Sequence, residues 1–186
     1  MLNNQQNFFP TLDLGEYILR EKQASDVRDF FNYYTDPEVN KYIISHIPKT
    51  LEETRMELNY WKNIFYQNDG IYFAIARKDT NQLIGTIGVN THIRHHRRIE
   101  LSYDLSKDYW RLGITTKAIK AVTEYCFEEM AINRIEAFIH PQNINSIKLL
   151  EKCKFKQEGL LRQHRFHIDR YVDVFIYSLL KNDHRL

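Results

Sequence analysis

A β-rich segment that passes through a loop with one glycine into an amphipathic helix is the feature that most constrains this fold. The segment runs from Ile99 to Leu105 and is broken at Ser106-Lys107-Asp108. The loop and helix start then read Tyr109-Trp110-Arg111-Leu112-Gly113-Ile114-Thr115-Thr116, and the helix gathers Ala118, Ile119, Val122, Cys126 and Met130 on one broad face. With a strand predicted over Arg134–Ile139, this stretch indicates helices packed on a sheet.

The remaining segments complete an α/β (α+β) pattern. Ser25 or Asp26 caps a first helix that stops near Asp36-Pro37, and the capping box of Thr50 and Glu53 opens a second. Further strands are predicted over Tyr17–Arg20, Ile71–Ala76 and Leu83–Val89, a short helix over Ser146–Lys152, and a closing antiparallel hairpin over Gly159–Ile168 and Tyr171–Leu180. This order predicts a mixed sheet with helices packed on it.

Composition points to one globular domain over residues 1–186. The chain is 43% apolar and 27% charged, as is usual for soluble proteins, and its formal net charge of +2 gives no reason to expect nucleic-acid binding. No apolar run reaches the roughly 20 residues of a membrane helix, so no membrane partner is expected. We interpret Met1–Pro10 as a flexible lead-in without signal-peptide features and expect a cytoplasmic protein. Cys126 and Cys153 are expected to be buried, reduced thiols.

The loop before the central helix is a candidate anion site. The first turn of a helix leaves unpaired N–H groups and partial positive charge, which suit a pyrophosphate. Gly113 lets the backbone approach an anion, Thr115 and Thr116 offer hydroxyls, and Arg111 offers charge. A plain turn is the alternative. The loop is neither a Walker A loop nor a dinucleotide fingerprint, because the lysine of the first and the extra glycines of the second are absent.

Three other features are open to more than one interpretation. Asn143-Ile144-Asn145-Ser146 follows a strand and opens a helix, and simple helix capping would explain it. The basic cluster from His92 to Arg98 suits a solvated loop, or contact with an acidic acceptor or ribosomal RNA; no cysteine or carboxylate ligands at metal spacing accompany it. Aromatic residues of the early helices serve either the core or an acceptor pocket, namely Tyr33, Tyr34, Tyr42, Trp61, Phe65 and Tyr66.

Taken together, these motifs resemble the GNAT superfamily of N-acetyltransferases, most closely its RimJ/RimL-type branch. The matching motifs are Glu100-Leu101-Ser102-Tyr103-Asp104-Leu105, Tyr109 to Thr116, Asn143 to Ser146, Glu151-Lys152-Cys153-Lys154-Phe155 and Glu158-Gly159-Leu160-Leu161-Arg162, with Tyr171-Val172-Asp173 and Tyr177-Ser178-Leu179-Leu180 at the end. The family pattern has glycine at the positions of Arg111, Ser102 and Lys154, and a small residue at Thr115. The strong part of the resemblance covers about Leu83 to Leu180.

The resemblance implies a mostly antiparallel twisted sheet with a splayed parallel strand pair at its centre and helices on both faces. Acetyl-CoA, with no metal, would lie between the strands at Ile99–Leu105 and Arg134–Ile139. Its predicted contacts are Leu101, Ser102, Tyr103, Leu105, Trp110, Arg111, Leu112, Gly113, Ile114, Thr115, Thr116, Asn143 and Ser146. Glu100 would act as the base and Ser146 would assist the leaving thiolate, while a strand carboxylate and a helix cap are the plain alternatives.

The implied activity is acetyl transfer from acetyl-CoA to a primary amine by direct attack on the thioester. A protein N-terminus is the leading acceptor, with possible contact to the ribosome. A small molecule such as a polyamine or an antibiotic is the second alternative, and a non-catalytic acyl-CoA-binding or RNA-binding module is the third. Monomer and homodimer both stay open.

Overall fold

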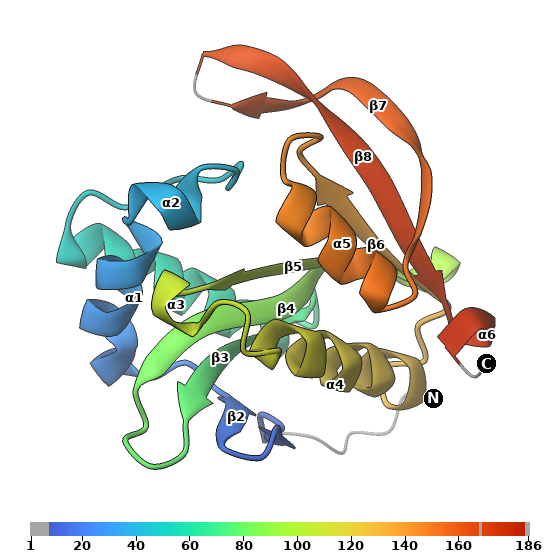
Figure 1. The fold of residues 1–186 in the computed structure, drawn as a ribbon. Helices are drawn as coiled ribbons and strands as arrows, with labels where there is room; N and C mark the ends of the chain where they lie inside the picture. Colours follow the sequence, from blue (N-terminus) through green and yellow to red (C-terminus); the bar gives the residue numbers. More distant parts are fainter. Residues whose placement is uncertain (1–7, 168, 185–186) are drawn as a thin grey trace.

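The computed structural model, which describes residues 8–167 and 169–184, is one eight-stranded sheet with helices on both faces (Figure 1). The strands are β1 (Leu12–Asp13), β2 (Tyr17–Arg20), β3 (Ile71–Arg77), β4 (Leu83–Ile93), β5 (Arg98–Leu105), β6 (Arg134–Ile139), β7 (Lys156–His167) and β8 (Arg170–Leu180). The helices are α1 (Val27–Tyr34), α2 (Pro37–Asn40), α3 (Leu51–Tyr66), α4 (Ile114–Glu128), α5 (Ile144–Lys152) and α6 (Lys181–His184). The sheet order is β1-β2-β3-β4-β5-β6-β8-β7.

The centre of the sheet holds a parallel strand pair that stays together for only three residues. β5 pairs with β6 from Arg98 opposite Arg134 to Glu100 opposite Glu136, whereas the neighbouring strand pairs are antiparallel. On its other side β5 keeps its pairing with β4 as far as Leu105. Past Glu100, β5 therefore has a strand partner on one side only, and the expected fold with a splayed parallel pair is confirmed.

Two apolar clusters hold the layers together because strand residues alternate between the faces. On one face Phe73 and Ile75 of β3 join the core that includes the buried side of α4. On the other face Ala74 of β3 and Leu83 of β4 pack with Phe30 of α1, among others. Each large side chain buried in this way contributes about 1.5–3 kcal/mol. The sheet is thereby fixed between α4 on one side and α1 with α3 on the other.

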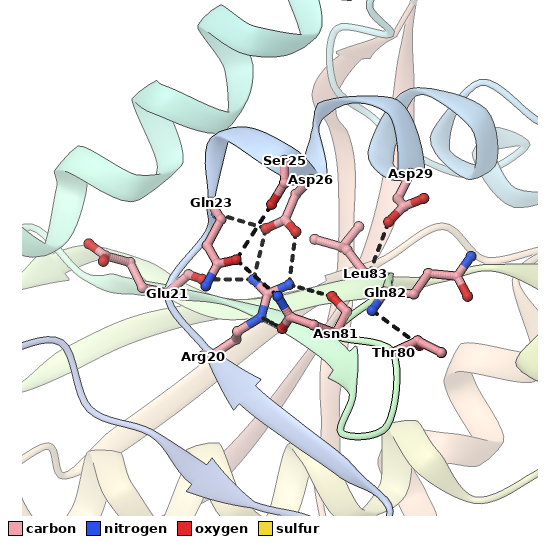
Figure 2. A network of polar contacts seen from close by, with 10 residues as sticks. All are labelled: Arg20, Glu21, Gln23, Ser25, Asp26, Asp29, Thr80, Asn81, Gln82 and Leu83. Atoms are coloured by element: carbon pink, nitrogen blue, oxygen red, sulfur yellow. Dashed lines mark hydrogen bonds and ion pairs between the residues drawn. The ribbon is translucent and has the colours of Figure 1, made fainter.

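A closed polar network anchors the start of α1 to the turn between β3 and β4 (Figure 2). The Arg20 guanidinium donates to both carboxylate oxygens of Asp26 at 2.8 Å, and to the side chain and carbonyl of Asn81. Asp26 also accepts the N–H of Gln23 at 2.7 Å, and Asp29 of α1 accepts the N–H of Leu83. The network fixes the height of α1 above the sheet, and α1 carries part of the cleft wall described below.

Several predicted boundaries needed correction. The strand expected over Leu83–Val89 continues to Ile93, and the capping box is incomplete: Thr50 accepts the N–H of Glu53, but Glu53 accepts from Lys49 instead of Thr50. β1, α2 and α6, of two to four residues each, were not predicted; β2 is equally short, but its apolar and β-favouring residues at Tyr17, Ile18 and Leu19 gave a strand signal that the other three lack.

Two predicted segments fall partly outside the described residues. Residues 1–7, which belong to the predicted lead-in, lie outside the described residues. Ile168, the last residue of a predicted strand, also lies outside them. Phe9, also in the predicted lead-in, packs its ring against Phe65 and Phe73. Both cysteines are buried and free, as expected. Among the described helices, none is long and apolar enough to cross a membrane.

Candidate active site

A cleft of about 800 Å³ opens where β5 and β6 separate. It is lined by the end of β5, the loop before α4, the first turn of α4, the start of α5 and residues from α1 to α3. All of the predicted site residues lie on its wall except Leu112, whose side chain is exposed to solvent. Segments far apart in the sequence therefore meet at one place, where the sheet is interrupted.

The first wall of the cleft is the free edge of β5. From Leu101 to Leu105 this edge has no pairing to β6. The indole N–H of Trp110 donates to the Leu105 carbonyl at 2.8 Å and ties the following loop to the strand end. An unpaired strand edge with backbone donors and acceptors can pair with an extended, amide-containing ligand, as in β-strand addition.

The second wall is the N-terminus of α4, which lacks a side-chain cap. Its N-cap residue is Gly113, with φ of 75°, and no side chain caps the first turn. A Cβ at Gly113 would meet no atom of the described residues within 4 Å, so the glycine serves the left-handed backbone and the open space beside it. By contrast, side chains cap α2, α3 and α5. The free N–H groups of α4 suit an anion.

Cations lie near this helix end. Arg111 precedes Gly113, and Lys148 and Lys152 of α5 also line the cleft. Arg111 and Lys154 both stand in turns where the family pattern has glycine. Their φ values are 65° and 68°. The two departures from the family pattern thus retain the left-handed backbone that glycine adopts most easily.

The third wall is the start of α5. Asn143 caps this helix through its side chain, which accepts the N–H of Ser146 at 3.2 Å. Asn143 therefore has the plain capping role, whereas the Ser146 hydroxyl is not the cap and lines the cleft. Near it lies the buried Tyr103 hydroxyl, which approaches the Ser146 side chain but forms no hydrogen bond of normal geometry among the described residues. Burial raises the pKa of Tyr103, so it stays a neutral O–H.

Glu100 sits at the point where β5 and β6 part, and Arg165 of β7 reaches it. One guanidinium nitrogen of Arg165, Nη2, lies 2.9 Å and 3.0 Å from the two carboxylate oxygens of Glu100. The same guanidinium stacks over the ring of Phe138, 5.0 Å from its centroid. Both partners line the cleft. The site thus has a carboxylate that can accept a proton and a guanidinium that can bind an anion.

The end of the cleft beyond Glu100 is largely aromatic. Tyr34, Tyr42 and Trp61, three of the aromatic residues considered for an acceptor pocket, line it, and Tyr42 stacks on His140. Phe65 and Tyr66 do not: Phe65 packs on Phe9, and the Tyr66 hydroxyl donates to Glu21.

Tyr33 lies outside this cleft because its hydroxyl is used inside the protein. It donates at 2.6 Å to Asp104, which also accepts from the hydroxyl and the N–H of Thr86. Removal from water raises the pKa of Asp104. Asp104 is therefore engaged in holding α1 against β4 and β5.

The basic cluster forms the turn between β4 and β5. Arg94, His95, His96 and Arg97 are exposed there, and none of them lines the cleft. Arg98 is paired with Glu136 inside the sheet region. Within residues 8–167 and 169–184 no group of three or more side chains could hold a metal ion.

Residues missed in the sequence analysis include Arg165, Lys148, Phe138 and His140. His140 directly follows β6, and ligands of open α/β sheets bind outside the carboxyl ends of strands, so its position could have been used. Arg165 had no such signal. The β7–β8 ladder shifts register between Leu161 and Arg165, which defeats alternate-residue counting.

Comparison with known proteins gives the same family at the level of sequence and fold. The model of the acetyltransferase (GNAT) domain matches residues 17–156. The uncharacterized N-acetyltransferase p20 of Bacillus licheniformis is 33% identical over 174 residues, which cover 94% of this chain and 98% of that protein. The structure of an acetyltransferase (GNAT family) from Bacillus anthracis has a TM-score of 0.81 at 25% identity and covers 93% of this chain and 99% of that one.

Two further structures share the fold and differ in their named acceptors. RimL, a ribosomal L7/L12 α-N-protein acetyltransferase, has a TM-score of 0.83 at 17% identity, covering 92% of this chain and 94% of that one. Spermidine N-acetyltransferase from Vibrio cholerae, with CoA and spermine, has a TM-score of 0.79 at 20% identity and covers 92% and 99%. At these identities the likeness shows the fold alone, for a RimL protein and a polyamine enzyme alike.

Proposed function

This chain belongs to the GNAT acetyltransferase family and is an N-acetyltransferase, and from that premise we propose that its cleft binds acetyl-CoA and a primary amine. The observation that carries the proposal is the free edge of β5 beside the uncapped N-terminus of α4. One feature suits the amide-rich pantetheine arm and the other suits the pyrophosphate. We further propose that this primary amine attacks the acetyl-CoA thioester directly.

The residues present fit acetyl-CoA. Leu101, Ser102, Tyr103 and Leu105 would face the pantetheine arm, and Asn143 would border it. The phosphates would rest on the backbone from Arg111 to Thr116, so that Leu112 would contribute through its backbone. Trp110 would hold the loop to the strand. The helix start consists of Gly113, Ile114, Thr115 and Thr116. Bound acetyl-CoA supplies an activated acetyl thioester.

Glu100 is the proposed base. An amine attacks only after its ammonium form loses a proton, and the Glu100 carboxylate lines the cleft where the strands part. The Ser146 hydroxyl is not used as a cap and can donate to the leaving thiolate, and the orphaned Tyr103 hydroxyl lies close by as a second donor. A positioned base contributes roughly 10²- to 10⁴-fold in rate.

Two kinds of amine are proposed as the acceptor. A protein N-terminus, including that of a ribosomal protein, is the first proposal, because RimL shares the fold and is named for such an acceptor. A small amine is the second, because the spermidine enzyme also shares the fold, with a TM-score of 0.79. A cytoplasmic location is proposed with both. The family model and the relatives named N-acetyltransferases speak against a binding module without catalysis, the third alternative of the sequence analysis.

An acceptor panel monitored by thiol release and by the mass of the product tests the proposal. The panel contains peptides with free N-termini, polyamines, aminoglycosides and free amino acids. We expect acetyl-CoA to bind and at least one amine to gain an acetyl group. Glu100→Gln should lower turnover most at low pH, where the amine is largely protonated. Tight acetyl-CoA binding without acetylation of any amine would contradict the proposal.

A further inference from the structure

Arg165 is the group in the cleft that the proposed chemistry does not use. We infer that Arg165 binds a carboxylate of the acceptor and that the acceptor is a free α-amino acid with an apolar side chain, its ammonium on Glu100 and its carboxylate on Arg165. The inference rests on the proposed function, and among its acceptors it selects a small amine over a protein N-terminus.

The Arg165 guanidinium has donors to spare. It contacts Glu100 through Nη2 alone, which lies 2.9 Å from Oε1 and 3.0 Å from Oε2. In the described part of the chain its Nε and Nη1 have no hydrogen-bond partner. A carboxylate that only held Arg165 would be expected to engage two nitrogens side by side, which is the strong geometry for this pair. The single-nitrogen contact leaves a fork of donors open to a second carboxylate.

The protein fixes Arg165 at this place by backbone and ring contacts. The β7–β8 register shifts just before it, Gln163 takes a left-handed φ of 51°, and the Gln163 N–H donates to the Asp173 carboxylate at 2.8 Å. The guanidinium then rests on the Phe138 ring. The shift re-aims the side chain toward β5, as bulges beside binding sites commonly do. Figure 1 shows the long β7–β8 hairpin that carries this segment at the edge of the sheet, beyond β6.

The spacing of the two charges selects among amine acceptors. In a free α-amino acid the ammonium and the carboxylate share one carbon, so they need partners of opposite charge that lie side by side, as Glu100 and Arg165 do. A polyamine would bring a second ammonium toward the guanidinium and would be repelled. Where a free amino acid has its carboxylate, a peptide N-terminus has a neutral carbonyl, which forms a weaker hydrogen bond with the guanidinium.

The wall around this ion pair favours an apolar side chain. Aromatic and aliphatic residues form it on the side of α1 to α3, namely Phe30, Tyr34, Val39, Ile43, Trp61 and Tyr72. Two acidic residues also line the cleft on this side, and both are already bound: Glu38 by Lys107, and Asp104 by the hydroxyls of Tyr33 and Thr86. Apolar contact with this wall would add to binding in proportion to the area buried.

Pairs of amino acids and their carboxamides test the inference. The twenty L-amino acids and their carboxamides are offered to the wild-type enzyme, Arg165→Gln and Arg165→Lys, with acetyl-CoA held at saturation. We expect an apolar amino acid to be a better substrate than its amide by at least about tenfold. Arg165→Gln should lower kcat/KM for the acid on the order of 10²-fold and for the amide by less than about threefold, as expected when one charged partner is removed. Arg165→Lys should retain part of the preference.

Two results would overturn the inference. One is that amino acids are not acetylated while a peptide or a polyamine is, in which case the proposed acetyl transfer stands. The other is that Arg165→Gln lowers kcat/KM equally for the amino acid and its carboxamide, which would make Arg165 a positioning residue for Glu100. Absence of acetylation of every amine, despite calorimetric binding of acetyl-CoA, would contradict the proposed function itself.

Discussion

Arg20 and Arg165 both face a carboxylate, yet their surroundings leave very different numbers of donors free. Arg20 places all of its guanidinium nitrogens in hydrogen bonds, to Asp26, Asn81 and the Glu21 carbonyl (Figure 2). Its side chain is 9% exposed and that of Asp26 is 2% exposed. Arg165 is 37% exposed and contacts Glu100 through one nitrogen.

The difference separates polar groups that hold the fold from polar groups that await a ligand. A buried polar group without a partner is costly, so a network that serves the fold closes on itself. The cleft does the opposite: the β5 edge, the α4 N-terminus, the Tyr103 hydroxyl and part of Arg165 all keep unused capacity. These unused donors and acceptors are concentrated in one cleft, where a ligand with many polar groups would fit.

The largest expected effect comes from opening the closed network. Asp26→Ala leaves the Arg20 guanidinium buried without its counter-charge, which should cost about 3–5 kcal/mol of unfolding free energy. Arg165→Ala is the matched control, because it breaks a partly exposed pair that contributes at most about 1 kcal/mol. Urea unfolding at neutral pH measures both. The comparison breaks down if the two variants lose the same stability.

Lys22 gives a second, smaller effect that depends on pH. Its ammonium donates to the Tyr72 carbonyl at 2.9 Å, and burial lowers its pKa to about 7. Above that pH the folded chain has released a proton that the unfolded chain, with an ordinary lysine pKa, still holds. The free energy of unfolding should therefore rise with pH between about 7 and 9, by at most about 1.4 kcal/mol per pH unit.

Lys22→Met removes the titrating group and should flatten this rise. Lys62, which is only half-buried and paired with Glu21, supplies the control Lys62→Met, and this variant should keep the rise. Unfolding curves at pH 7, 8 and 9 provide the data. Parallel pH profiles for wild type and Lys22→Met would show that Lys22 keeps its proton in the fold.

Two glycines with the same backbone sharpen the comparison within the cleft. Gly15 and Gly113 have φ of 87° and 75°, and a Cβ on either would meet no atom of residues 8–167 and 169–184 within 4 Å. Alanine at either position should cost roughly 1–2 kcal/mol through the left-handed backbone. Gly113→Ala alone should also weaken acetyl-CoA binding, by about tenfold, because its methyl group points into the proposed phosphate site. Calorimetry that finds equal affinities for the two variants would place the phosphates elsewhere.

Local chemistry was readable from the sequence, and long-range geometry was not. The strand, the glycine loop and the face of α4 depend on residues close in sequence, so their periodicity predicted them. The free edge of β5 depends on where β6 departs, about 35 residues later in the chain, and only the family resemblance implied it. Arg111 and Lys154 were visible as departures from the pattern, whereas their left-handed φ values are properties of the folded loops. Arg165 reaches Glu100 only because of the register shift in β7.

Hydrogen exchange of the backbone amides, with and without saturating acetyl-CoA, measures most directly whether the unused donors of the cleft receive the ligand. We expect acetyl-CoA to slow exchange between Leu101 and Leu105 and between Gly113 and Thr116 by more than it slows exchange around Arg20 and Asp26, where only the general stabilisation of the fold acts. At about 100 times the dissociation constant, binding should also stabilise the whole fold by roughly 2.7 kcal/mol. Unchanged exchange in both cleft segments, at an acetyl-CoA concentration that calorimetry shows to be saturating, would contradict the assignment of this cleft.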